Sequence, residues 1–573
     1  MMTALSCRTS LLLAFLVTAG CNLTTPLDAD ISTPQEVVDG ADVTGSSDSA
    51  QGEEDLGSGW TDISIPPHTV QPCSEIYDEA LLPTFEVEIA PDVWAAMLEE
   101  WKNGDVWEAE GKPVKVYRPA KWFRYEDETF FDVMIRPKGS PFQWPLSPTK
   151  MQFNISFTQI NKDQRFRGVR KLLLDAPAWD PTFFHDRLGM SVMRDLGIPA
   201  SCANNARLII NGEYYGIFTS IERVDKEFLT RWFGPLLNDG NLYKYFYKAN
   251  NEDDGDTSDL EETFFFDGMT GEFTGDSLTL EELAAKVDLD QAILEWAGEA
   301  IIPDGDGFWI GSDNFYLYNH PTRGFLFIPW DLDISFDHKK PFVDPITHSV
   351  DWGIFEGKPP QFETVMADPV WSQKFKDALD TARAVYDPTV LQGRIDQWSA
   401  QIIDAVAEDT NKPFSTQEHI DQVAVLRDFV QQRADYYDGW KVCTSDGGPS
   451  VDKSFAGANF RFLLSACGWE LSEQACVKAG GHLASPQSDE EQAFLVAESQ
   501  ALVEGYWWLG ANDIALEGAY VGADGSPLPY DSWGNEQPDG EDSQNCAALS
   551  PTETGDWQDK ECSSPYPAIC RLP

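Results

Sequence analysis

Apolar and polar residues alternate along several short segments of the chain, and this period of two is typical of half-buried β-strands. Phe85–Ile89 shows the alternation most clearly, and the Asn211–Gly212 pair is typical of a tight turn between two strands. Strands are predicted in this way at 85–89, 129–136, 150–157, 206–210, 214–221 and 241–247.

In other segments the apolar residues recur at helical spacing, and Pro and Gly mark the ends. A helix over 181–196 is stopped by Gly197 and Pro199, and another helix begins at Pro91. Helices are predicted at 91–101, 181–196, 226–234, 279–298, 370–384, 389–407, 416–440 and 469–476. Strands and helices together predict the α+β fold class.

One stretch combines a buried strand with acidic residues. Phe325–Ile328 is fully apolar, which favours a buried strand, and Pro329 ends it because proline cannot donate to a sheet ladder. Asp331 and Asp333 follow directly. Carboxylates at the end of a buried strand are costly unless a cation meets them, and oxygen ligands suit Mg²⁺ or Ca²⁺. The stretch therefore predicts a metal site.

Polar residues upstream of this strand extend the candidate site. Asp304 and Asp306 lie in a segment with two glycines, and Asn314 directly precedes the strand 315–318. Protein kinases use such a set: one Asp orients the accepting hydroxyl, an Asn holds a metal ion, and a later Asp holds the metal ions on the phosphates. These residues alone leave open a β-hairpin with acidic turns.

Composition narrows the classes of partner. The 573-residue chain is long enough for two or three domains, and its 95 acidic against 41 basic residues give a net charge of −54. This charge argues against nucleic acid, whose phosphates need Lys and Arg, and against an anionic membrane surface. It suits an exported protein that meets divalent cations.

The N-terminus has the pattern of an export signal. Arg8 precedes the apolar run 11–17, which is too short to span a bilayer, and small residues lead to Cys21. The segment resembles a bacterial lipoprotein signal in which Cys21 becomes the lipidated first residue; a plain signal peptide is the alternative. Residues 22–65 contain ten acidic and no basic residues, which predicts a disordered tether at an outer membrane or cell surface.

An ordered set of motifs lies between residues 80 and 440. It consists of Gly139–Ser140, Lys150, Arg187, 211–216 (NGEYYG), 222–225 (ERVD), 314–318 (NFYLY) and 328–333 (IPWDLD). Each motif is weak alone, but the order of the set is specific. It resembles the CotH family of spore-coat protein kinases, which have a divergent kinase-like fold.

The resemblance implies a role for each matching residue. Lys150 would neutralise the phosphates of ATP, and Asp306 would orient the accepting hydroxyl. Asn314 and Asp331 would hold Mg²⁺ or Mn²⁺ between the phosphates. Asp333 would add a ligand or support one from the second layer of contacts.

The match also has departures. Asp304 competes with Asp306 for the catalytic role, because the spacing to Asn314 is longer than in the family. Lys150 is single where many members have two adjacent bases. Glu222 stands where the family has an acid before its next helix, which implies a place near the nucleotide. A pseudokinase that keeps the fold without activity stays open as an alternative.

The chain after Gly447 carries a second set of motifs. They are a helix at 469–476, WLGAND at 508–513, Trp533, QPD at 537–539, WQD at 557–559 and four cysteines in register. The set resembles a C-type lectin-like domain over its whole length, and the resemblance implies the disulfides Cys476–Cys570 and Cys546–Cys562.

Eight cysteines follow Cys21 in this exported chain, and the even number predicts disulfides. Four of them are not in the two pairs implied above. They are Cys73, Cys202, Cys443 and Cys467. Cys73 and Cys443 flank the first domain and are candidates for a pair, although the sequence does not fix the connectivity.

Ca²⁺-dependent members of the lectin-like family bind the ion and sugar hydroxyls through oxygen side chains on either side of a cis proline. Gln537–Pro538–Asp539 matches that triplet in the version associated with galactose-type glycans, and Asp559 matches another ligand. The resemblance therefore implies a Ca²⁺ site. Protein binding through the same face is the alternative.

Two neighbouring positions depart from the Ca²⁺-binding pattern. Gln558 stands where Asn is usual, and Gln544 stands where Glu is usual. A glutamine offers a neutral oxygen, so the loss of charge predicts weaker Ca²⁺ binding. Glu541 or Asp542 would compensate.

We therefore expect a lipoprotein signal (1–20), a tether (21–65), a kinase-like body (66–445), a linker (446–454) and a lectin-like domain (455–573). The predicted function is transfer of the ATP γ-phosphate to Ser or Thr hydroxyls of a surface or coat protein. The lectin-like domain would bind a glycan or a protein. The alternative is a non-catalytic adhesin or structural protein with a pseudokinase fold.

Overall fold

The computed structural model describes most of the chain from His68 onward. The described residues are 68–139, 150–176, 179–244, 258–264, 266–267, 272–273, 278–311, 314–338, 345–346, 348, 350, 360–445, 448–503, 505–540, 544–550 and 555–573. The predicted signal, Cys21, the tether, Ser140, Glu541 and Asp542 lie outside them.

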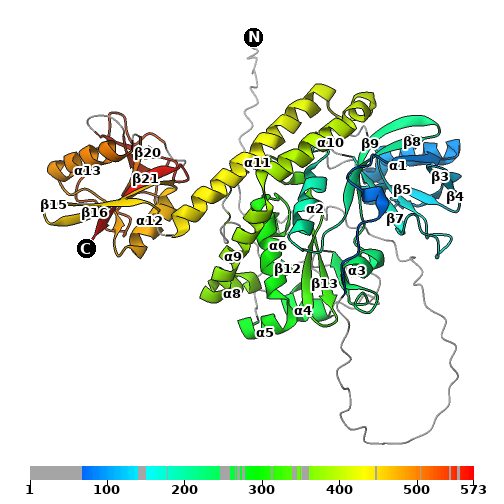
Figure 1. Cartoon of the computed structure of the whole chain (residues 1–573), viewed down its shortest axis with the longest axis horizontal. Helices are drawn as coiled ribbons and strands as arrows, with labels where there is room; N and C mark the ends of the chain where they lie inside the picture. Colours follow the sequence, from blue (N-terminus) through cyan, green and yellow to red (C-terminus); the bar gives the residue numbers. More distant parts are fainter. Residues whose placement is uncertain are drawn as a thin grey trace, which may run out of the picture.

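The body is built on a nine-stranded sheet of order β2-β5-β6-β7-β9-β8-β1-β3-β4, in which only β1 and β8 are parallel neighbours. The strands are β1 (Thr84–Glu88), β2 (Arg118–Pro119), β3 (Trp122–Tyr125), β4 (Glu128–Phe130), β5 (Met134–Lys138), β6 (Gln152–Ser156), β7 (Lys171–Asp175), β8 (Ala203–Ile210) and β9 (Glu213–Ile221). Helix α1 (Pro91–Ala109) lies beside this sheet (Figure 1). The predicted α+β class is confirmed.

Two predicted elements are each split in the structure. The strand predicted at 129–136 is interrupted by Asp132, whose φ of 58° is left-handed, a conformation that Asp adopts more readily than most residues. The helix predicted at 279–298 is α5 (Leu280–Lys286) followed by α6 (Leu289–Ile301). Asp288 starts α6, because its side chain accepts a hydrogen bond from the Gln291 amide.

A helical part of the body packs around a three-stranded sheet of order β10-β13-β14 (Figure 1). Its strands are β10 (Leu242–Lys244), β13 (Phe315–His320) and β14 (Gly324–Pro329). Its main helices are α2 (His185–Asp195), α3 (Lys226–Phe233), α6, α7 (Phe308–Gly311), α8 (Pro360–Ala367), α9 (Pro369–Val385), α10 (Pro388–Glu408) and α11 (Thr416–Ser445).

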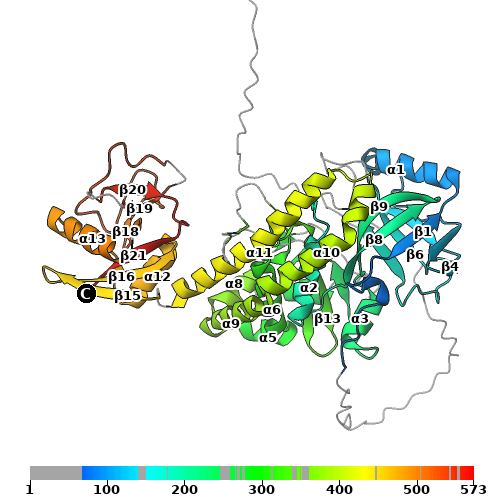
Figure 2. The ribbon, with the colours of Figure 1, turned by 45° about the horizontal axis from the view of Figure 1, so that its top comes forward.

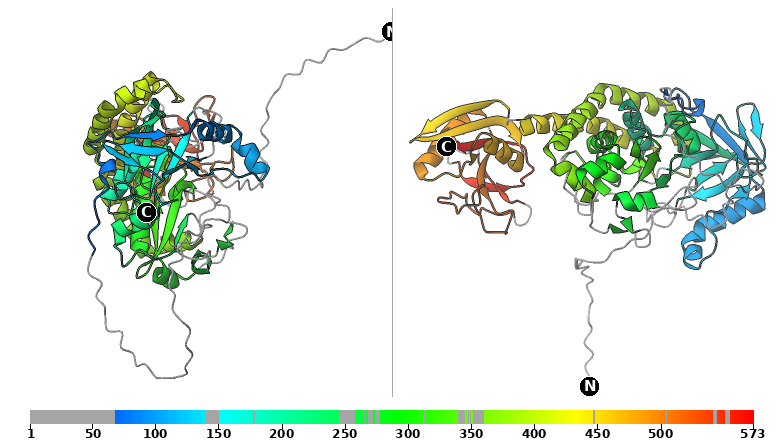
Figure 3. Two further views of the ribbon diagram at one scale, coloured as in Figure 1. Left: turned by 90° about the vertical axis from the view of Figure 1, so that its right-hand side faces the viewer. Right: turned by 90° about the horizontal axis from the view of Figure 1, so that it is seen from below.

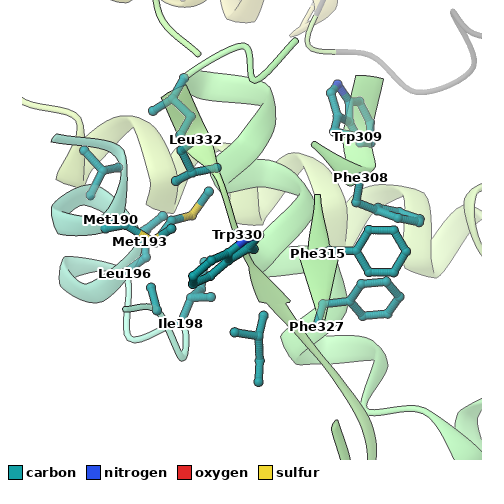
Figure 4. Packing of buried hydrophobic residues seen from close by; sticks show 14 of the residues in the cluster. Met190, Met193, Leu196, Ile198, Phe308, Trp309, Phe315, Phe327, Trp330 and Leu332 are labelled. Atoms are coloured by element: carbon teal, nitrogen blue, oxygen red, sulfur yellow. The ribbon is translucent and has the colours of Figure 1, made fainter. Parts of the chain in front are cut away.

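The apolar core of this part fixes the segment that follows β14. Figure 4 shows Trp330 between α2 side chains and a group of aromatic rings that includes Phe315 and Phe327. Trp330 and Leu332 are buried, whereas Asp331 and Asp333 between and after them are only partly buried. Burial of the two apolar side chains therefore anchors the segment and leaves the two carboxylates outside the core.

The C-terminal domain has its own sheet, of order β15-β16-β21-β18-β19-β20, with β17 paired to β21. The strands are β15 (Ser450–Phe455), β16 (Ala458–Cys467), β17 (His482–Leu483), β18 (Trp507–Asn512), β19 (Cys546–Leu549), β20 (Trp557–Lys560) and β21 (Tyr566–Leu572). Helices α12 (Trp469–Lys478) and α13 (Asp489–Leu502) accompany them. Because β15 pairs with β16, this sheet begins inside the segment predicted as a linker.

Helix α11 connects the two domains. Figures 2 and 3 show it running along the body and continuing to the C-terminal domain, where its end contacts β16 and α12. A disulfide between Cys443 of α11 and Cys467 of β16 closes this junction.

Candidate active site

A cleft with two adjoining halves lies where the nine-stranded sheet meets the segment after β14. Each half encloses about 500 Å³, and Lys138, Gly139 and Asp331 line both. Gly139 follows β5 at a φ of 69°, a conformation that glycine adopts without steric cost. The sheet and the helical part therefore contribute to one site.

One half of the cleft is acidic. Five carboxylates line it: Asp175, Asp180, Asp186, Asp331 and Asp333. Burial raises the pKa of Asp186 well above its usual value, and Asp331 and Asp175 raise it further. Burial also raises the pKa of Asp333 well above its usual value, and Asp331 and Asp186 raise it further. Such a group is stable as anions only when a cation is bound among them.

The other half of the cleft is basic. Five cations line it: Arg136 and Lys138 of β5, Lys244 of β10, and Lys115 and Arg223 of loops. Tyr316 and Trp330 add aromatic surface, with ring centroids 5.5 Å apart. Basic residues are the minority in this acidic chain. Five basic side chains around one half of the cleft therefore indicate a ligand with several negative charges.

Lys138 joins the two halves. It forms an ion pair with Asp175 and lowers the pKa of Asp186. In a kinase site, the phosphates need cations on one side and metal-binding carboxylates on the other. The position of Lys138 between the basic and the acidic half is consistent with such a site. The sequence contained a signal for this residue, because Lys138 directly precedes the Gly139–Ser140 motif.

The two candidate catalytic acids have different surroundings. Asp304 is fully buried and raises the pKa of Glu295, which belongs to the interior of α6. Asp306 is partly buried and close enough to Asp333 to raise the pKa of that carboxyl. Of the two, Asp306 is therefore the one near Asp333; like Asn314, it is not among the residues that line the cleft.

Asn314 and Asp331 are neighbours at the ends of paired strands. The Trp330 amide donates to the Asn314 carbonyl over 3.1 Å. Both residues have left-handed backbones, with φ of 48° for Asn314 and 59° for Asp331. Non-glycine residues hold this conformation mainly where surrounding contacts fix it, and such positions gather at functional sites.

The carboxylates fit a metal ion that is coordinated partly by the protein and partly by phosphate oxygens. In the described part of the chain, no three His, Cys, Asp or Glu side chains converge closely enough to hold an ion by themselves. Mg²⁺ is commonly bound by one or two carboxylates together with substrate phosphates, so Asp331, Asp333 and Asn314 suit an ion that arrives with a nucleotide.

His185 contacts the segment after β14 at two points. Its Nδ1 lies 2.9 Å from the Asp333 carbonyl oxygen, and its Nε2 lies 3.1 Å from Asp337 Oδ1. Burial lowers its pKa, but Asp180 and Asp337 outweigh that effect, and the pKa rises to about 9. The sequence motifs did not reveal His185 or Asp186, because α2 brings both to the cleft from far along the chain.

Two predicted nucleotide contacts have other partners in the structure. Lys150 is buried and forms an ion pair of 2.6 Å with Asp409, and burial lowers its pKa to about 8. Glu222 is bonded to Arg231 and to the Cys202 amide. Neither residue lines the cleft, so the predicted phosphate role of Lys150 and the nucleotide-side place of Glu222 are not supported.

The predicted metal ligands of the C-terminal domain also lie together. The Gln537–Pro538 bond is cis, and Asp559 of β20 accepts hydrogen bonds from the amides of Asp539 and Gly540. Gln537 Oε1 in turn accepts one from the Asp559 amide. These oxygens are therefore bonded to the protein itself, and as a set they do not fit the predicted Ca²⁺ site.

Four disulfides are present among the described residues. Cys476–Cys570 and Cys546–Cys562 occur as the lectin-like pattern implied. The suggested Cys73–Cys443 pair is wrong, because Cys73 is bonded to Cys202 and Cys443 to Cys467. Four such bonds fit folding in an oxidising compartment. Within the described ranges, every helix is too short or too polar to span a bilayer.

Comparison with protein families gives two matches. A model described as CotH kinase protein matches residues 135–437, and a model described as Lectin C-type domain matches residues 465–572. They follow the order in which the sequence motifs predicted them.

Individual relatives match the C-terminal domain. Tetranectin of Mus musculus is 43% identical over 108 residues, which are 18% of this chain and 53% of that protein. C-type mannose receptor 2 of Homo sapiens is 32% identical over 116 residues, 20% of this chain and 7% of the receptor. The chain thus spans about half the length of tetranectin.

Among solved structures, the cow CD23 C-type carbohydrate-recognition domain is 28% identical, with a TM-score of 0.20, and the match covers 22% of this chain and 93% of that one. A calcium-independent type II antifreeze protein is 29% identical, also with a TM-score of 0.20, over 22% of this chain and 95% of that one.

Proposed function

The chain belongs to the CotH kinase protein family, and from this premise we propose that its body is an exported, surface-anchored protein kinase that transfers the ATP γ-phosphate to Ser or Thr hydroxyls. The observation that carries the proposal is the cleft in which a basic half and an acidic half meet at Lys138 and Asp331. A phosphate chain with its metal ions needs both kinds of surface side by side.

The basic half would bind and orient the phosphates. Lys138 takes the role predicted for Lys150, because it faces both halves of the cleft. Arg136, Arg223 and Lys244 would neutralise the remaining phosphate charge. Trp330 and Tyr316 supply an aromatic wall beside these cations.

The acidic half would hold the metal ion and the accepting hydroxyl. Asp331, Asp333 and Asn314 are the proposed ligands of Mg²⁺ or Mn²⁺. The ion, when bound, neutralises the charge that develops on the transferred phosphoryl group. Asp306 would accept a hydrogen bond from the Ser or Thr hydroxyl and orient its oxygen, because it is close enough to Asp333 to raise the pKa of that carboxyl.

The remaining parts of the chain would bring the kinase to its substrate. Cys21 is the proposed lipid anchor, and the acidic segment after it is the proposed tether. The lectin-like domain would bind a glycan, of galactose type by its QPD triplet, or a protein of the surface or coat. The match of residues 465–572 to the Lectin C-type domain model supports such binding.

Nucleotide binding and metal dependence test this proposal together. The purified chain without residues 1–21 is melted with and without ATP, in the presence of Mg²⁺ or Mn²⁺. We expect ATP to raise the Tm of the body, and Asp331→Asn to abolish this rise. Asp404→Asn, a change at an exposed carboxylate of α10, should leave it intact. The proposal fails if ATP with either metal produces no shift in the unmodified chain.

A non-catalytic binding protein is the second candidate. The observation that favours it is the internal ion pair of Lys150, since the lysine of the family motif is unavailable to a nucleotide. A chain that binds ATP but transfers no phosphate, even to generic protein acceptors, would favour this candidate.

A further inference from the structure

We infer that the lectin-like domain fixes its ligand-binding loop through Asp559 instead of through Ca²⁺, so that this face binds its partners without the ion. The loop is residues 533–540, and it carries Gln537 and Asp539. The inference concerns the second domain alone and is independent of the proposed kinase activity.

Asp559 ties the loop to β20 from both sides. Its Oδ1 lies 3.1 Å from the Asp539 nitrogen and its Oδ2 lies 2.8 Å from the Gly540 nitrogen. The Asp559 amide donates back to Gln537 Oε1 over 3.1 Å. With 1% of its surface exposed, Asp559 is shielded from water that would weaken these bonds.

Backbone contacts continue the same attachment at the start of the loop. The Gly534 amide donates to the Trp557 carbonyl over 2.9 Å, and the Trp557 amide donates to the Ser532 carbonyl over 2.8 Å. Trp533 packs against Trp557, with ring centroids 5.6 Å apart. The loop is therefore joined to β20 along most of its length by the protein alone.

The other expected ligands offer little to a cation. Gln558 Oε1 accepts a hydrogen bond of 3.0 Å from the Tyr506 hydroxyl. Gln544 packs on Gly540, where an added Cβ would lie 2.2 Å from that of Gln544. Among the described residues of the implied set, the carboxylates are Asp539 and Asp559, whereas Ca²⁺ takes six to eight oxygens and its affinity rises with the number of charged ligands.

A cation at Asp559 would have to share both carboxylate oxygens with N–H groups whose hydrogens point at them. The N–H dipoles and the ion are electrostatically alike, so occupancy by one disfavours the other. We conclude that the amides occupy the position that Ca²⁺ takes in ion-dependent relatives. Asp539, which is exposed, is left to hydrogen-bond a ligand directly.

A second group of oxygens makes the choice of variant important. Asp513 Oδ1 and Asn545 Oδ1 are both buried and have no hydrogen-bond partner, and the Asp513 amide donates to the Asn545 carbonyl over 3.1 Å. Any Ca²⁺ uptake at this second group would register in a titration of the unmodified chain. The experiment therefore needs variants that separate the two places.

The test is a calorimetric titration of CaCl₂ into the EDTA-treated full chain, compared with Asp539→Asn and Asp513→Asn. We expect the Ca²⁺ dissociation constant of Asp539→Asn to lie within about twofold of that of the unmodified chain, or neither chain to bind Ca²⁺. Every chain in the test also carries Asp331→Asn, because the acidic half of the body's cleft is itself a proposed metal site, and any remaining response should disappear in Asp513→Asn. A drop in Ca²⁺ affinity of tenfold or more in Asp539→Asn would overturn the inference.

A second variant tests the role of Asp559 itself. Asp559→Asn replaces one accepting oxygen by an NH₂ group that faces an amide N–H, so we expect the Tm of the lectin-like domain to fall equally in Ca²⁺ and in EDTA. A fall seen only in Ca²⁺ would mean that Asp559 acts through the ion, which contradicts the inference.

Discussion

Lys138 and Lys150 carry the same charge but have opposite surroundings. Lys138 lines the cleft and pairs with the buried Asp175. Lys150 is 3% exposed, and its partner Asp409 is also bonded to the amides of Ile217 and Asn411. One lysine is thus accessible to a ligand, and the other joins the sheet to the loop after α10.

Replacing each lysine by methionine should separate these roles. Lys138→Met removes a phosphate contact, so we expect the ATP dissociation constant to rise at least tenfold with little change in Tm. Lys150→Met leaves Asp409 buried without its cation, which costs about 3–5 kcal/mol. Calorimetric ATP binding and denaturant unfolding check the pair. Loss of ATP binding in a stably folded Lys150→Met chain would contradict the assignment.

A pair of buried acids in α6 predicts a pH dependence. Burial raises the pKa of Glu295 to about 8, and burial together with Glu295 raises the pKa of Glu299 further. The folded protein therefore favours neutral Glu295. This contribution is fully present below the usual glutamate pKa and is lost as the pH rises through about 8.

Glu295→Gln should reduce this loss, because glutamine imitates the neutral acid. From pH 5 to pH 9 we expect the variant to lose roughly 2–4 kcal/mol less stability than the unmodified body. Urea unfolding at several pH values measures the difference. An unchanged pH slope would show that Glu295 titrates normally. Glu473→Gln, in the other domain, is the matched control and should leave the body's slope unchanged.

At the scale of elements, helix α2 and the segment after β14 form one unit. Gly189 of α2 approaches Leu332, and an added Cβ would lie 2.9 Å from Leu332 Cδ1. On the same helix, Asp186 accepts a hydrogen bond of 2.9 Å from the Leu332 amide. The position of Asp331 and Asp333 therefore depends on how closely α2 packs.

Gly189→Val should displace the segment after β14 that carries Asp331 and Asp333. The added volume pushes on Leu332, so we expect a loss of at least tenfold in ATP-dependent transfer and about 1–3 kcal/mol in stability. Gly393→Ala in α10 is the matched control, because nothing lies within 4 Å of its added Cβ. It should stabilise the body by up to about 1 kcal/mol. Full activity in Gly189→Val would show that the position of Asp331 and Asp333 does not depend on the packing of α2.

Sequence patterns predicted elements better than contacts between elements. The apolar run 325–328 and the acids after it were enough to predict β14 and the carboxylates of the cleft. Asp175, Asp186 and His185 could not be assigned, because only the packing of β7 and α2 brings them there. The ion pair of Lys150 could not be predicted for the same reason: its partner Asp409 is far along the chain.

At the scale of the whole molecule, α11 joins the kinase-like body to the lectin-like domain. Its Arg433 donates to the carbonyls of Ala300 and Ile301 at the end of α6, directly before the segment that carries Asp306. Ten residues further along the helix, Cys443 forms a disulfide with Cys467 of the lectin-like domain. The 30-residue helix is thus held by the body in its middle and by a disulfide near its C-terminal end, and we expect it to restrain the two domains.

Removing the disulfide should loosen this relation without unfolding either domain. In a Cys443→Ser, Cys467→Ser chain we expect faster proteolysis between the domains and a broader distance distribution in solution scattering, with ATP binding by the body unchanged. Loss of the Cys476–Cys570 bond should instead destabilise the lectin-like domain. Identical cleavage rates with and without the Cys443–Cys467 bond would show that this disulfide does not restrain the two domains.

The most direct test of the account follows label from γ-³²P-ATP to protein in the presence of Mn²⁺, for the unmodified chain and for Asp306→Asn. The account predicts labelled Ser or Thr with the unmodified chain. With Asp306→Asn it predicts at least a hundredfold less label but the same ATP-induced rise in Tm, because Asp306 orients the hydroxyl and does not hold the nucleotide. Equal labelling by both chains, or no labelling by either, would contradict it.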